Sequence, residues 1–412
     1  MSEVYDVCQK AKENVSAISL LTEKDMNILL TVSAKALREN ADFIISENTK
    51  DCKACTRGEQ FVDRLMLDKK RIDGIAAGLE KLIALKCPVG EILEERTLDS
   101  GVRLQRVRVP LGVLGIIYEA RPNVTADAIG LCIKSGNAVV LRGSKDALFS
   151  NKAICTVIKK AILDAGYNPE FIQLIEDTSR EGATEFMKMN GVVDVLIPRG
   201  SAGLIRSAVE NATVPIIETG TGNCHVYFEK TADINKGLPV LINAKTQRTS
   251  VCNACESLLL DEDFAKKHLS EICAALQEKN VQIVACEKCR EILPELSAAT
   301  EQDFYEEFLS LKISVKIVGG LDEAIAHINH YGTHHSDCII TEDETAACRF
   351  LNEVDSAAVY VNASTRFTDG FEFGLGAEMG ISTQKLHARG PMGLRELTSY
   401  KYKIIGNGQV RK

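Results

Sequence analysis

Short apolar runs, separated by helical segments, recur along most of this chain of 412 residues. Residues 111–117 and 138–141 are such runs, and glycine or charged residues bound each of them. Runs of this kind are typical of parallel strands that are buried on both faces and connected by helices. The alternation continues with runs at residues 171–175, 192–197 and 225–228. The pattern therefore predicts an α/β fold with a doubly wound sheet.

A second series of strands and helices begins near residue 233. An apolar helix is expected to about residue 244, and strands are expected at residues 257–260, 282–285, 314–318, 338–340 and 357–361. A chain of 412 residues also exceeds the size at which one hydrophobic core usually stops growing. We therefore expect two α/β units, with a cleft between them in which a ligand binds.

Both ends of the chain depart from this pattern. Residues 3–85 carry apolar positions at helical spacing, whereas residues 102–109 alternate apolar and charged side chains as a half-exposed strand does. The tail, residues 397–410, alternates again through Tyr400 and Tyr402. A strand at the end of a chain needs a partner strand, and we predict a flap that joins copies of the chain.

The balance of residue types excludes several classes of protein. Hydrophobic residues make up 45% and charged residues 26% of the chain, which is typical of a folded protein rather than a disordered one. The net charge of -8, without a long basic run, argues against a nucleic-acid partner. No apolar run approaches membrane-spanning length, and the N-terminus resembles neither a signal nor a transit peptide. Fourteen cysteines without a secretory signal are typical of reduced thiols, so we expect a cytoplasmic protein without a membrane partner.

Three pairs of cysteines have the CxxC spacing, at residues 52 and 55, 252 and 255, and 286 and 289. A zinc site or a redox pair must be considered for such pairs. Long stretches of sequence separate the three pairs, whereas the ligands of structural zinc sites usually lie close together. We therefore expect no metal site and assign most of the thiols to the core.

Cys252 differs from the other thiols because it lies in a loop-like segment between an apolar helix and the strand at residues 257–260. A thiol in a connection is positioned rather than packed. Lys245 and Arg248 lie nearby in the sequence and would favour the thiolate, the form that attacks an acyl carbon. From the residues themselves, a nucleophile and a structural thiol both remain open for Cys252.

The two commonest phosphate-binding motifs, GxGxxG and GxxxxGK[ST], are absent. Instead, the strand within residues 134–144 ends in Arg142, Gly143 and Ser144 ahead of a helix. A turn from strand to helix can present backbone amides and a cation to a phosphate group. A basic residue that is merely solvated at the end of a strand fits the pattern as well.

Several segments together resemble the gamma-glutamyl phosphate reductases, the glutamate-5-semialdehyde dehydrogenases of the aldehyde dehydrogenase superfamily. The similarity covers nearly the whole chain and is carried by residues 109–125, 134–144, 197–201, 223–227, 245–259 and 374–397. The resemblance implies an aldehyde dehydrogenase-like α/β fold. It also implies NADPH-dependent reduction of L-glutamyl 5-phosphate to L-glutamate 5-semialdehyde, with release of phosphate, in proline biosynthesis.

The same resemblance assigns chemical roles to individual residues. The family's nucleophile is the cysteine that precedes an asparagine, here Cys252, and its thiolate would form a thioester with the substrate. Asn123 and the backbone N–H of Cys252 would be the two donors to the oxyanion. Glu218, which lies 34 residues before Cys252, stands where hydrolytic aldehyde dehydrogenases keep the base that activates water. An acyl phosphate reductase needs no such base, so Glu218 is either auxiliary or a plain carboxylate at the end of a strand.

For the cofactor, the resemblance places Arg142 beside the adenine ribose, where Lys145 could join it on a 2′-phosphate, which favours NADPH over NADH. Glu306 resembles the carboxylate that holds the nicotinamide ribose, although an exposed acidic helix would look the same. Arg366 is the candidate for binding a carboxylate or the phosphate of the substrate. The complete set of cofactor candidates is Arg142, Gly143, Ser144, Lys145, Pro198, Arg199, Gly200, Ser201 and Glu306.

The predicted domains follow from these assignments. Residues 1–95, 111–232 and 366–390 would bind the cofactor, residues 233–365 would carry the nucleophile, and residues 96–110 and 391–412 would form the oligomerisation flap. We expect a homo-oligomer, a dimer or larger, and the lability of an acyl phosphate makes the glutamate 5-kinase that produces it a candidate partner. Because of Glu218, a hydrolytic or coenzyme A-acylating aldehyde dehydrogenase is the alternative function.

Overall fold

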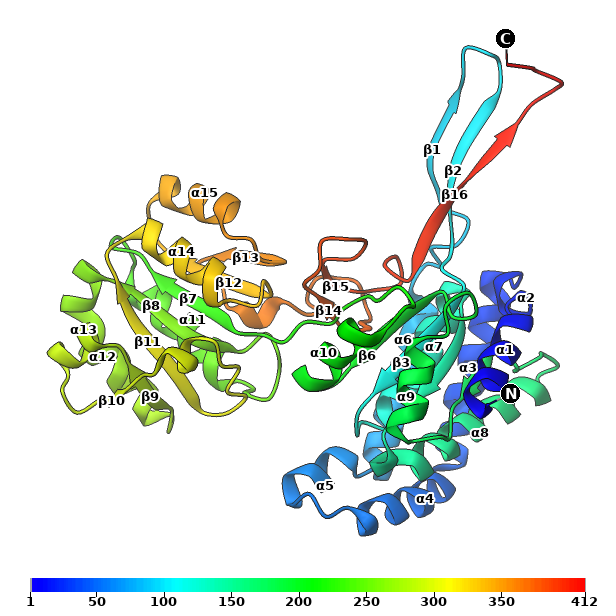
Figure 1. Cartoon of the computed structure of the whole chain (residues 1–412), viewed down its shortest axis with the longest axis horizontal. Helices are drawn as coiled ribbons and strands as arrows, with labels where there is room; N and C mark the ends of the chain where they lie inside the picture. The colour runs from blue at the N-terminus through cyan, green and yellow to red at the C-terminus, as the bar shows by residue number, and fades with distance from the viewer. Residues whose placement is uncertain (1, 412) are drawn as a thin grey trace. The chain divides into compact units, whose positions relative to one another are not determined.

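The structure is a computed structural model that describes residues 2–411, apart from the side chains at 59 and 60, and it divides into two compact units (Figure 1). Unit 1 extends to Glu218 and also contains Gly374–Gly380 and the chain from Met392 onward. Unit 2 contains Thr219–Phe373 and Ile381–Pro391. Each unit contains a parallel sheet with helical crossovers, so the predicted α/β class is confirmed.

Unit 1 begins with the helices that the spacing of apolar residues predicts. They are α1 (Glu3–Glu13), α2 (Ser16–Ser19), α3 (Glu23–Glu39), α4 (Ala41–Ala54), α5 (Glu59–Leu65) and α6 (Lys69–Ala84). α3 begins at a capping box, in which the side chains of Thr22 and Asp25 each accept a hydrogen bond from the other's backbone N–H. Its apolar face, which includes Met26, Leu29 and Leu30, is buried, and the helix packs against α6. None of the described helices is long and apolar enough to cross a membrane.

The sheet of unit 1 has four parallel strands in the order β5-β4-β3-β6. These strands are β3 (Val113–Tyr118), β4 (Ala138–Arg142), β5 (Ile172–Leu174) and β6 (Val195–Arg199). The connecting helices are α7 (Asn123–Ser135), η1 (Lys145–Ala147), α8 (Leu148–Asp164) and α9 (Arg180–Met187), and α10 (Ala202–Asn211) follows β6. Because parallel strands end at the same edge of a sheet, the segments that follow β3, β4 and β6 share one edge.

The sheet of unit 2 has seven parallel strands in the order β10-β9-β11-β8-β7-β12-β13. These strands are β7 (Cys224–Phe228), β8 (Cys255–Asp261), β9 (Gln282–Ala285), β10 (Ser297–Ala298), β11 (Lys312–Val318), β12 (Ser336–Ile340) and β13 (Ala358–Val361). Its helices are α11 (Ile234–Thr246), α12 (Glu262–Glu278), α13 (Glu287–Ile292), η2 (Glu301–Phe304), α14 (Leu321–Tyr331), α15 (Glu344–Glu353) and η3 (Thr365–Phe367). A short pair, β14 (Ile381–Ser382) and β15 (Gly390–Pro391), completes the unit.

β7 corrects one expectation about the strand order. The sequence pattern groups residues 225–228 with the first series of strands, but β7 pairs with β8 and β12 in the sheet of unit 2. That grouping is wrong because burial on both faces identifies a strand without identifying its neighbours. The functions predicted for the separate domains stay predictions.

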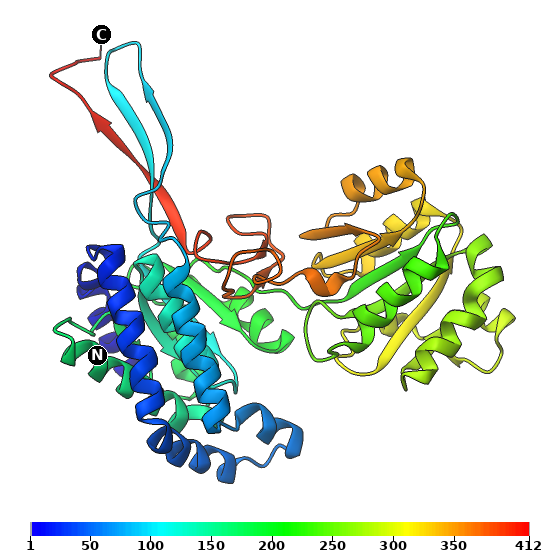
Figure 2. The same ribbon diagram turned by 180° about the vertical axis from the view of Figure 1, so that it is seen from behind.

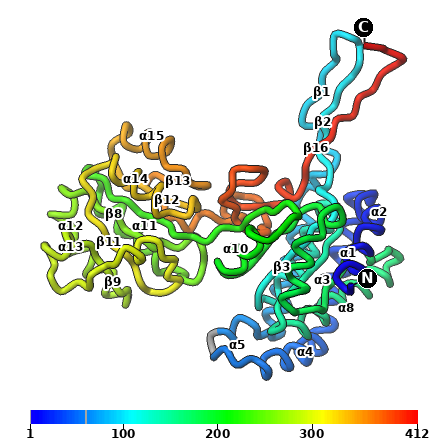
Figure 3. Tube along the Cα trace, in the orientation of Figure 1, coloured from blue at the N-terminus to red at the C-terminus, as the bar shows by residue number. Residues whose placement is uncertain are grey.

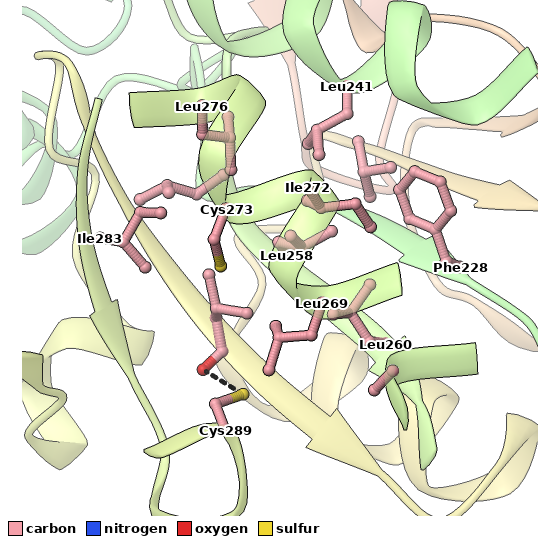
Figure 4. Close-up of a cluster of buried hydrophobic side chains, with 14 of the residues drawn as sticks. Phe228, Leu241, Leu258, Leu260, Leu269, Ile272, Cys273, Leu276, Ile283 and Cys289 are labelled. Carbon is pink, nitrogen blue, oxygen red and sulfur yellow. Dashed lines mark hydrogen bonds between the residues drawn. The ribbon is translucent and has the colours of Figure 1, made fainter. Parts of the chain in front are cut away.

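The larger core of unit 2 lies where α11 and α12 pack onto the sheet (Figure 4). Leu258 and Leu260 of β8 meet Leu269 and Ile272 of α12 in this core. Leu259, between the two strand residues, belongs to the cluster on the opposite face, with residues of α14 and α15. Both faces of the strand are therefore buried, which explains why the sequence shows an unbroken apolar run here.

A three-stranded antiparallel sheet in unit 1 joins residues from distant parts of the chain. Its strands are β1 (Ile92–Thr97), β2 (Arg103–Pro110) and β16 (Thr398–Ile405), in the order β1-β2-β16. β2 and β16 lie side by side in both views and pair over the whole length of β16 (Figures 2 and 3). The prediction that the strand in the tail pairs with another strand is confirmed. The joining of copies through this sheet stays a prediction.

The core of unit 2 can be tested by removing one side chain. Leu269, on α12, is 1% exposed, so we expect Leu269→Ala to lower the free energy of unfolding by about 2–5 kcal/mol, because it leaves a cavity. Leu163→Ala is the matched control, since Leu163 is also helical but 61% exposed. The control should change stability by no more than about 0.5 kcal/mol. Urea-induced unfolding measures both variants, and equal effects would contradict the packing described.

Candidate active site

The loop around Cys252 connects α11 to β8, as the sequence predicts. α11 ends at Thr246 and β8 begins at Cys255, so Cys252 belongs to neither element. Cys252 is half-buried, whereas Cys255 is completely buried, and burial raises the pKa of Cys255 to about 12. Of the two thiols, Cys252 is therefore the one that a substrate can reach.

The base of this loop is closed by an ion pair in the interior of unit 2. Lys245, near the end of α11, binds Glu256, the second residue of β8, and neither side chain has exposed surface. Glu256 also accepts a hydrogen bond from the backbone N–H of Leu309 at 3.2 Å. Burial raises the pKa of Glu256, and the charge of Lys245 opposes that rise. The position of Lys245 in the sequence suggested that its charge favours the thiolate of Cys252. In the structure, Lys245 instead forms an ion pair with Glu256 at the base, or stem, of the loop.

The segment that leads into β7 lies directly against the backbone of Cys252. A Cβ at Gly222 would lie 1.4 Å from the carbonyl oxygen of Cys252, so only glycine fits there. The Cys224 thiol donates a hydrogen bond to the same carbonyl at 3.2 Å. Burial raises the pKa of Cys224 well above its ordinary value, which keeps this thiol protonated as a donor. The peptide that carries Cys252 is therefore held by Gly222, just before β7, and by Cys224, the first residue of β7.

Two carboxylates next to each other in the sequence have different surroundings. Glu306, the predicted ligand of the nicotinamide ribose, is exposed and accepts a hydrogen bond from Gln302 at 3.2 Å. Glu307 is half-buried and accepts a hydrogen bond from the backbone N–H of Gly222 at 2.6 Å. Burial, and then the charge of Glu306, raise the pKa of Glu307, which the Gly222 hydrogen bond opposes. Sequence reasoning missed Glu307, and the only signal for it was the Glu-Glu doublet itself.

Arg366 lies in η3 and is held between the two ends of the Cys252 loop. Its Nε donates to Oε1 of Gln247, just after α11, at 2.9 Å. At the other end, Asn253 donates to the carbonyl of Thr368 at 2.8 Å, and Thr365 donates to the carbonyl of Asn253 at 2.7 Å. The structure thus brings together Cys252 and Arg366, which the sequence separates by more than a hundred residues.

The groups around Arg366 shift its pKa in opposite directions. Burial, and then the positive charge of Arg248, lower the pKa of Arg366. The negative charges of Asp369 and of a thiolate at Cys252 act in the opposite direction. Arg248 is exposed, unlike the half-buried Arg366. The Cys252 loop and η3 thus carry one exposed arginine, Arg248, and one half-buried arginine, Arg366.

In unit 1, Asn123 is the first residue of α7 and is exposed. Its side-chain amide donates to Asp127, one turn along the helix, at 2.9 Å. Burial raises the pKa of Asp127 to about 6, against the effects of Asn123 and of Arg199. The side-chain amide of Asn123, which is the predicted donor to the oxyanion, is therefore oriented by Asp127 of the same helix.

The predicted adenine-binding segment follows β4. Arg142 is buried and donates to the carbonyl oxygen of Ser179, and burial lowers its pKa while Asp177 opposes that shift. Arg142 Nε and Ser144 Oγ are buried and have no hydrogen-bond partner among the described residues. Lys145 follows them and is exposed. Buried polar atoms without partners are rare, and here they are consistent with a bound polar ligand.

The loop after β6 carries the other predicted phosphate contacts, residues 198–201. Ser201 precedes α10, and both its backbone N–H and its hydroxyl donate to Glu119, at 3.0 and 2.7 Å. A Cβ at Gly200 would lie 2.8 Å from the same carboxylate. Glu119 was not predicted as a site residue, and it occupies the end of α10 that favours anions. Glu218 is half-buried and ends this part of unit 1.

Unit 2 contains a second CxxC pair, whose two thiols are close in space as well as in sequence. The sulfur atoms of Cys286 and Cys289 lie 3.6 Å apart, and hydrogen bonding from Cys289 lowers the pKa of Cys286 to about 6. Within residues 2–411, no group of three or more His, Cys, Asp or Glu side chains is arranged to hold a metal ion.

Comparison with known proteins places this geometry in a family. The model of the aldehyde dehydrogenase family matches residues 1–288. The chain is 52% identical to the gamma-glutamyl phosphate reductase of Carboxydothermus hydrogenoformans over 414 residues, covering 100% of both chains. It is 53% identical to that of Clostridium perfringens strain SM101 over 406 residues, covering 98% of both. The crystal structure of the gamma-glutamyl phosphate reductase from Thermotoga maritima matches with a TM-score of 0.98 and 45% identity over 100% of both chains. The predicted resemblance and fold are confirmed.

The ion pair at the stem of the Cys252 loop gives a first prediction. Glu256→Gln should lower the free energy of unfolding by about 3–5 kcal/mol, because it leaves Lys245 charged and buried. The double variant Lys245→Met/Glu256→Leu should recover most of that loss. Lys266→Met removes an exposed pair on α12 and should cost less than about 1 kcal/mol. Urea-induced unfolding measures all three variants. An unchanged free energy of unfolding in Glu256→Gln would show that the ion pair does not stabilise the fold.

Asp127 gives a second prediction, on pH. Its pKa in the folded protein is about 6, above that of an unfolded aspartate, so the folded state binds the proton more tightly. The stability of the wild type should therefore fall as pH rises from about 4 to about 6, while Asp127→Asn should not lose this contribution. Because Asp127 is only half-buried, we expect the variant to gain about 1 kcal/mol over the wild type across that interval. Asp164→Asn on α8 is the exposed control, and an equal pH dependence in both variants would contradict this assignment.

Proposed function

We propose, on the premise that this chain belongs to the aldehyde dehydrogenase family and within it to the gamma-glutamyl phosphate reductases, that it reduces L-glutamyl 5-phosphate to L-glutamate 5-semialdehyde in proline biosynthesis. The observation that carries the proposal is the 52% identity to a relative of that name over the full length of the chain. A half-buried cysteine in a connecting loop supplies the nucleophile that such a reaction needs.

In the first step the Cys252 thiolate attacks the acyl carbon of the substrate. The bond from carbon to sulfur forms, the bond from carbon to the phosphate oxygen breaks, and inorganic phosphate leaves with the electron pair. The backbone N–H of Cys252 and the side-chain amide of Asn123 are the proposed donors to the oxyanion that develops. A thioester on Cys252 results.

The second step reduces the thioester to the aldehyde. The carbonyl carbon of the thioester stays on Cys252 while it is reduced, and NADPH held by the residues proposed below would supply the hydride. The oxyanion of the thiohemiacetal then collapses, the bond from carbon to sulfur breaks, and Cys252 regains its thiolate as the semialdehyde leaves. No water is consumed in either step, so Glu218 is at most auxiliary.

The edge of the sheet in unit 1 has donors that fit a dinucleotide phosphate. Arg142 Nε and Ser144 Oγ are buried and unsatisfied by the described residues, and the exposed Lys145 suits a 2′-phosphate, which supports NADPH. At the start of α10, Ser201 donates to the Glu119 carboxylate, so a cofactor phosphate that binds there would have to displace this carboxylate. We assign the nicotinamide ribose to Glu306, with its neighbour Glu307 as the alternative. Gly143, Pro198, Arg199, Gly200 and Ser201 complete the proposed cofactor set.

We also propose that the chain acts in the cytoplasm as a homo-oligomer, a dimer or larger. Exposed apolar and aromatic side chains on β16 support an interface at this sheet; they are Tyr400, Tyr402, Ile404 and Ile405. A contact with glutamate 5-kinase is proposed from the lability of the acyl phosphate.

The reaction is tested most directly in reverse, starting from the stable aldehyde. With L-glutamate 5-semialdehyde and NADP, the wild type should form NADPH only when inorganic phosphate is present, because phosphate must release the acyl group from Cys252. Cys252→Ser should lower the turnover number by at least about a thousandfold, because it removes the nucleophile. Cys348→Ser, at an exposed thiol on α15, is the control and should retain full turnover.

Three outcomes would contradict the proposal. Oxidation that runs equally well without phosphate and yields free glutamate would establish a hydrolytic aldehyde dehydrogenase, with Glu218 as its base. A requirement for coenzyme A in place of phosphate would establish an acylating one. Full turnover by Cys252→Ser would remove this thiol from the mechanism.

A further inference from the structure

We propose that Arg366 and Arg248 together form the subsite for the phosphate that leaves when the thioester forms, and that Gln247 positions Arg366 for it. The subsite rests on the proposed function, because it assumes an acyl phosphate as substrate. It goes beyond that function by naming a second cation, a positioning residue and the group they bind.

The geometry that carries this inference is the closure of the Cys252 loop around η3. The Nε of Arg366 donates to Gln247 at 2.9 Å, at the start of the loop. Asn253, at the end of the loop, donates a hydrogen bond to the carbonyl of Thr368, and its own carbonyl accepts one from the hydroxyl of Thr365. These two threonines lie on either side of Arg366 in the sequence. The guanidinium is therefore held in place before any ligand arrives, which lowers the entropic cost of binding an anion.

Arg248 brings a second positive charge to the same place. It directly follows Gln247, whose side chain accepts the hydrogen bond from Arg366 at 2.9 Å, so the loop carries a second arginine next to this contact. In the described part of the chain, no carboxylate lies within 4.0 Å of either guanidinium. Two like charges repel each other, and the Arg366 side chain is half-buried, so the arrangement favours the binding of an anion of high charge.

Phosphate fits this position better than the carboxylate of the substrate for two reasons. The leaving oxygen and the Cys252 sulfur are bonded to the same carbon at the moment of attack, whereas the carboxylate lies several bonds away along the glutamyl chain. A phosphate dianion also carries twice the charge of a carboxylate and offers three oxygens, which suits two guanidinium groups.

Gln247 explains why the Arg366 side chain keeps its charge for the ligand. A neutral amide oxygen orients the guanidinium through Nε at 2.9 Å without neutralising it. A carboxylate at the same position would form an ion pair and compete with phosphate. Gln247 is thus a positioning residue, and its substitution by glutamate is predicted to be more harmful to phosphate binding than its substitution by leucine.

The first test measures phosphate binding without turnover. The alkylation rate of Cys252 by iodoacetamide is followed by mass spectrometry while inorganic phosphate is titrated. Phosphate should slow the reaction in the wild type, and about tenfold more phosphate should be needed for the same protection in Arg248→Gln and in Arg366→Gln. Arg349→Gln, at an exposed arginine of α15 that pairs with Asp322 and Glu353, is the control and should behave as the wild type does.

The second test separates phosphate from carboxylate. In the reverse reaction, Arg248→Gln should raise the KM for phosphate about tenfold and leave the KM for the semialdehyde unchanged. Gln247→Glu should raise the KM for phosphate more than Gln247→Leu does, with kcat at saturating phosphate affected less than kcat/KM in both variants.

The outcomes distinguish the subsite from the function on which it rests. Absence of phosphate protection in the wild type, or equal protection in the Arg248→Gln variant, would overturn the subsite even if turnover required phosphate. A raised KM for the semialdehyde with an unchanged KM for phosphate would also overturn it, in favour of a carboxylate site. Turnover without phosphate would refute the proposed function itself.

Discussion

The buried ion pair between Lys245 and Glu256 is the interaction on which the candidate active site depends. Removing two charges from water costs several kcal/mol per ion, so such a pair persists only where geometry and further hydrogen bonds compensate for that loss. Here the pair joins the end of α11 to the start of β8 and closes the loop between them. With the stem fixed, the residues from Gln247 to Asn253 can be irregular and still present Cys252 in one conformation.

Most of the secondary structure was predictable because burial leaves a periodic trace in the sequence. The capped helix after Thr22 and the apolar run of β8 follow directly from local pattern. The place of β7 was not predictable, because the neighbours of a parallel strand are set by contacts between distant segments. A strand buried on both faces looks the same in either sheet.

The candidate site shows the same division between local and distant information. Cys252 could be singled out because a loop between two regular elements is visible in the sequence. The ion pair between Lys245 and Glu256, and the hydrogen bond that the Gly222 N–H donates to Glu307, could not be foreseen, since each depends on how separate elements approach one another. Glu119 at the start of α10 is a third example, because it reaches Ser201 across 82 residues of chain.

The pairing of β2 with β16 has a consequence for how the chain matures. β2 is synthesised long before its partner β16, because the two strands lie far apart in the sequence. The edge of β2 that faces β16 therefore stays unpaired until β16 has been made, and only then is the three-stranded sheet complete. A chain that lacks β16 would leave this edge of β2 exposed, and an exposed strand edge can pair with another chain and aggregate.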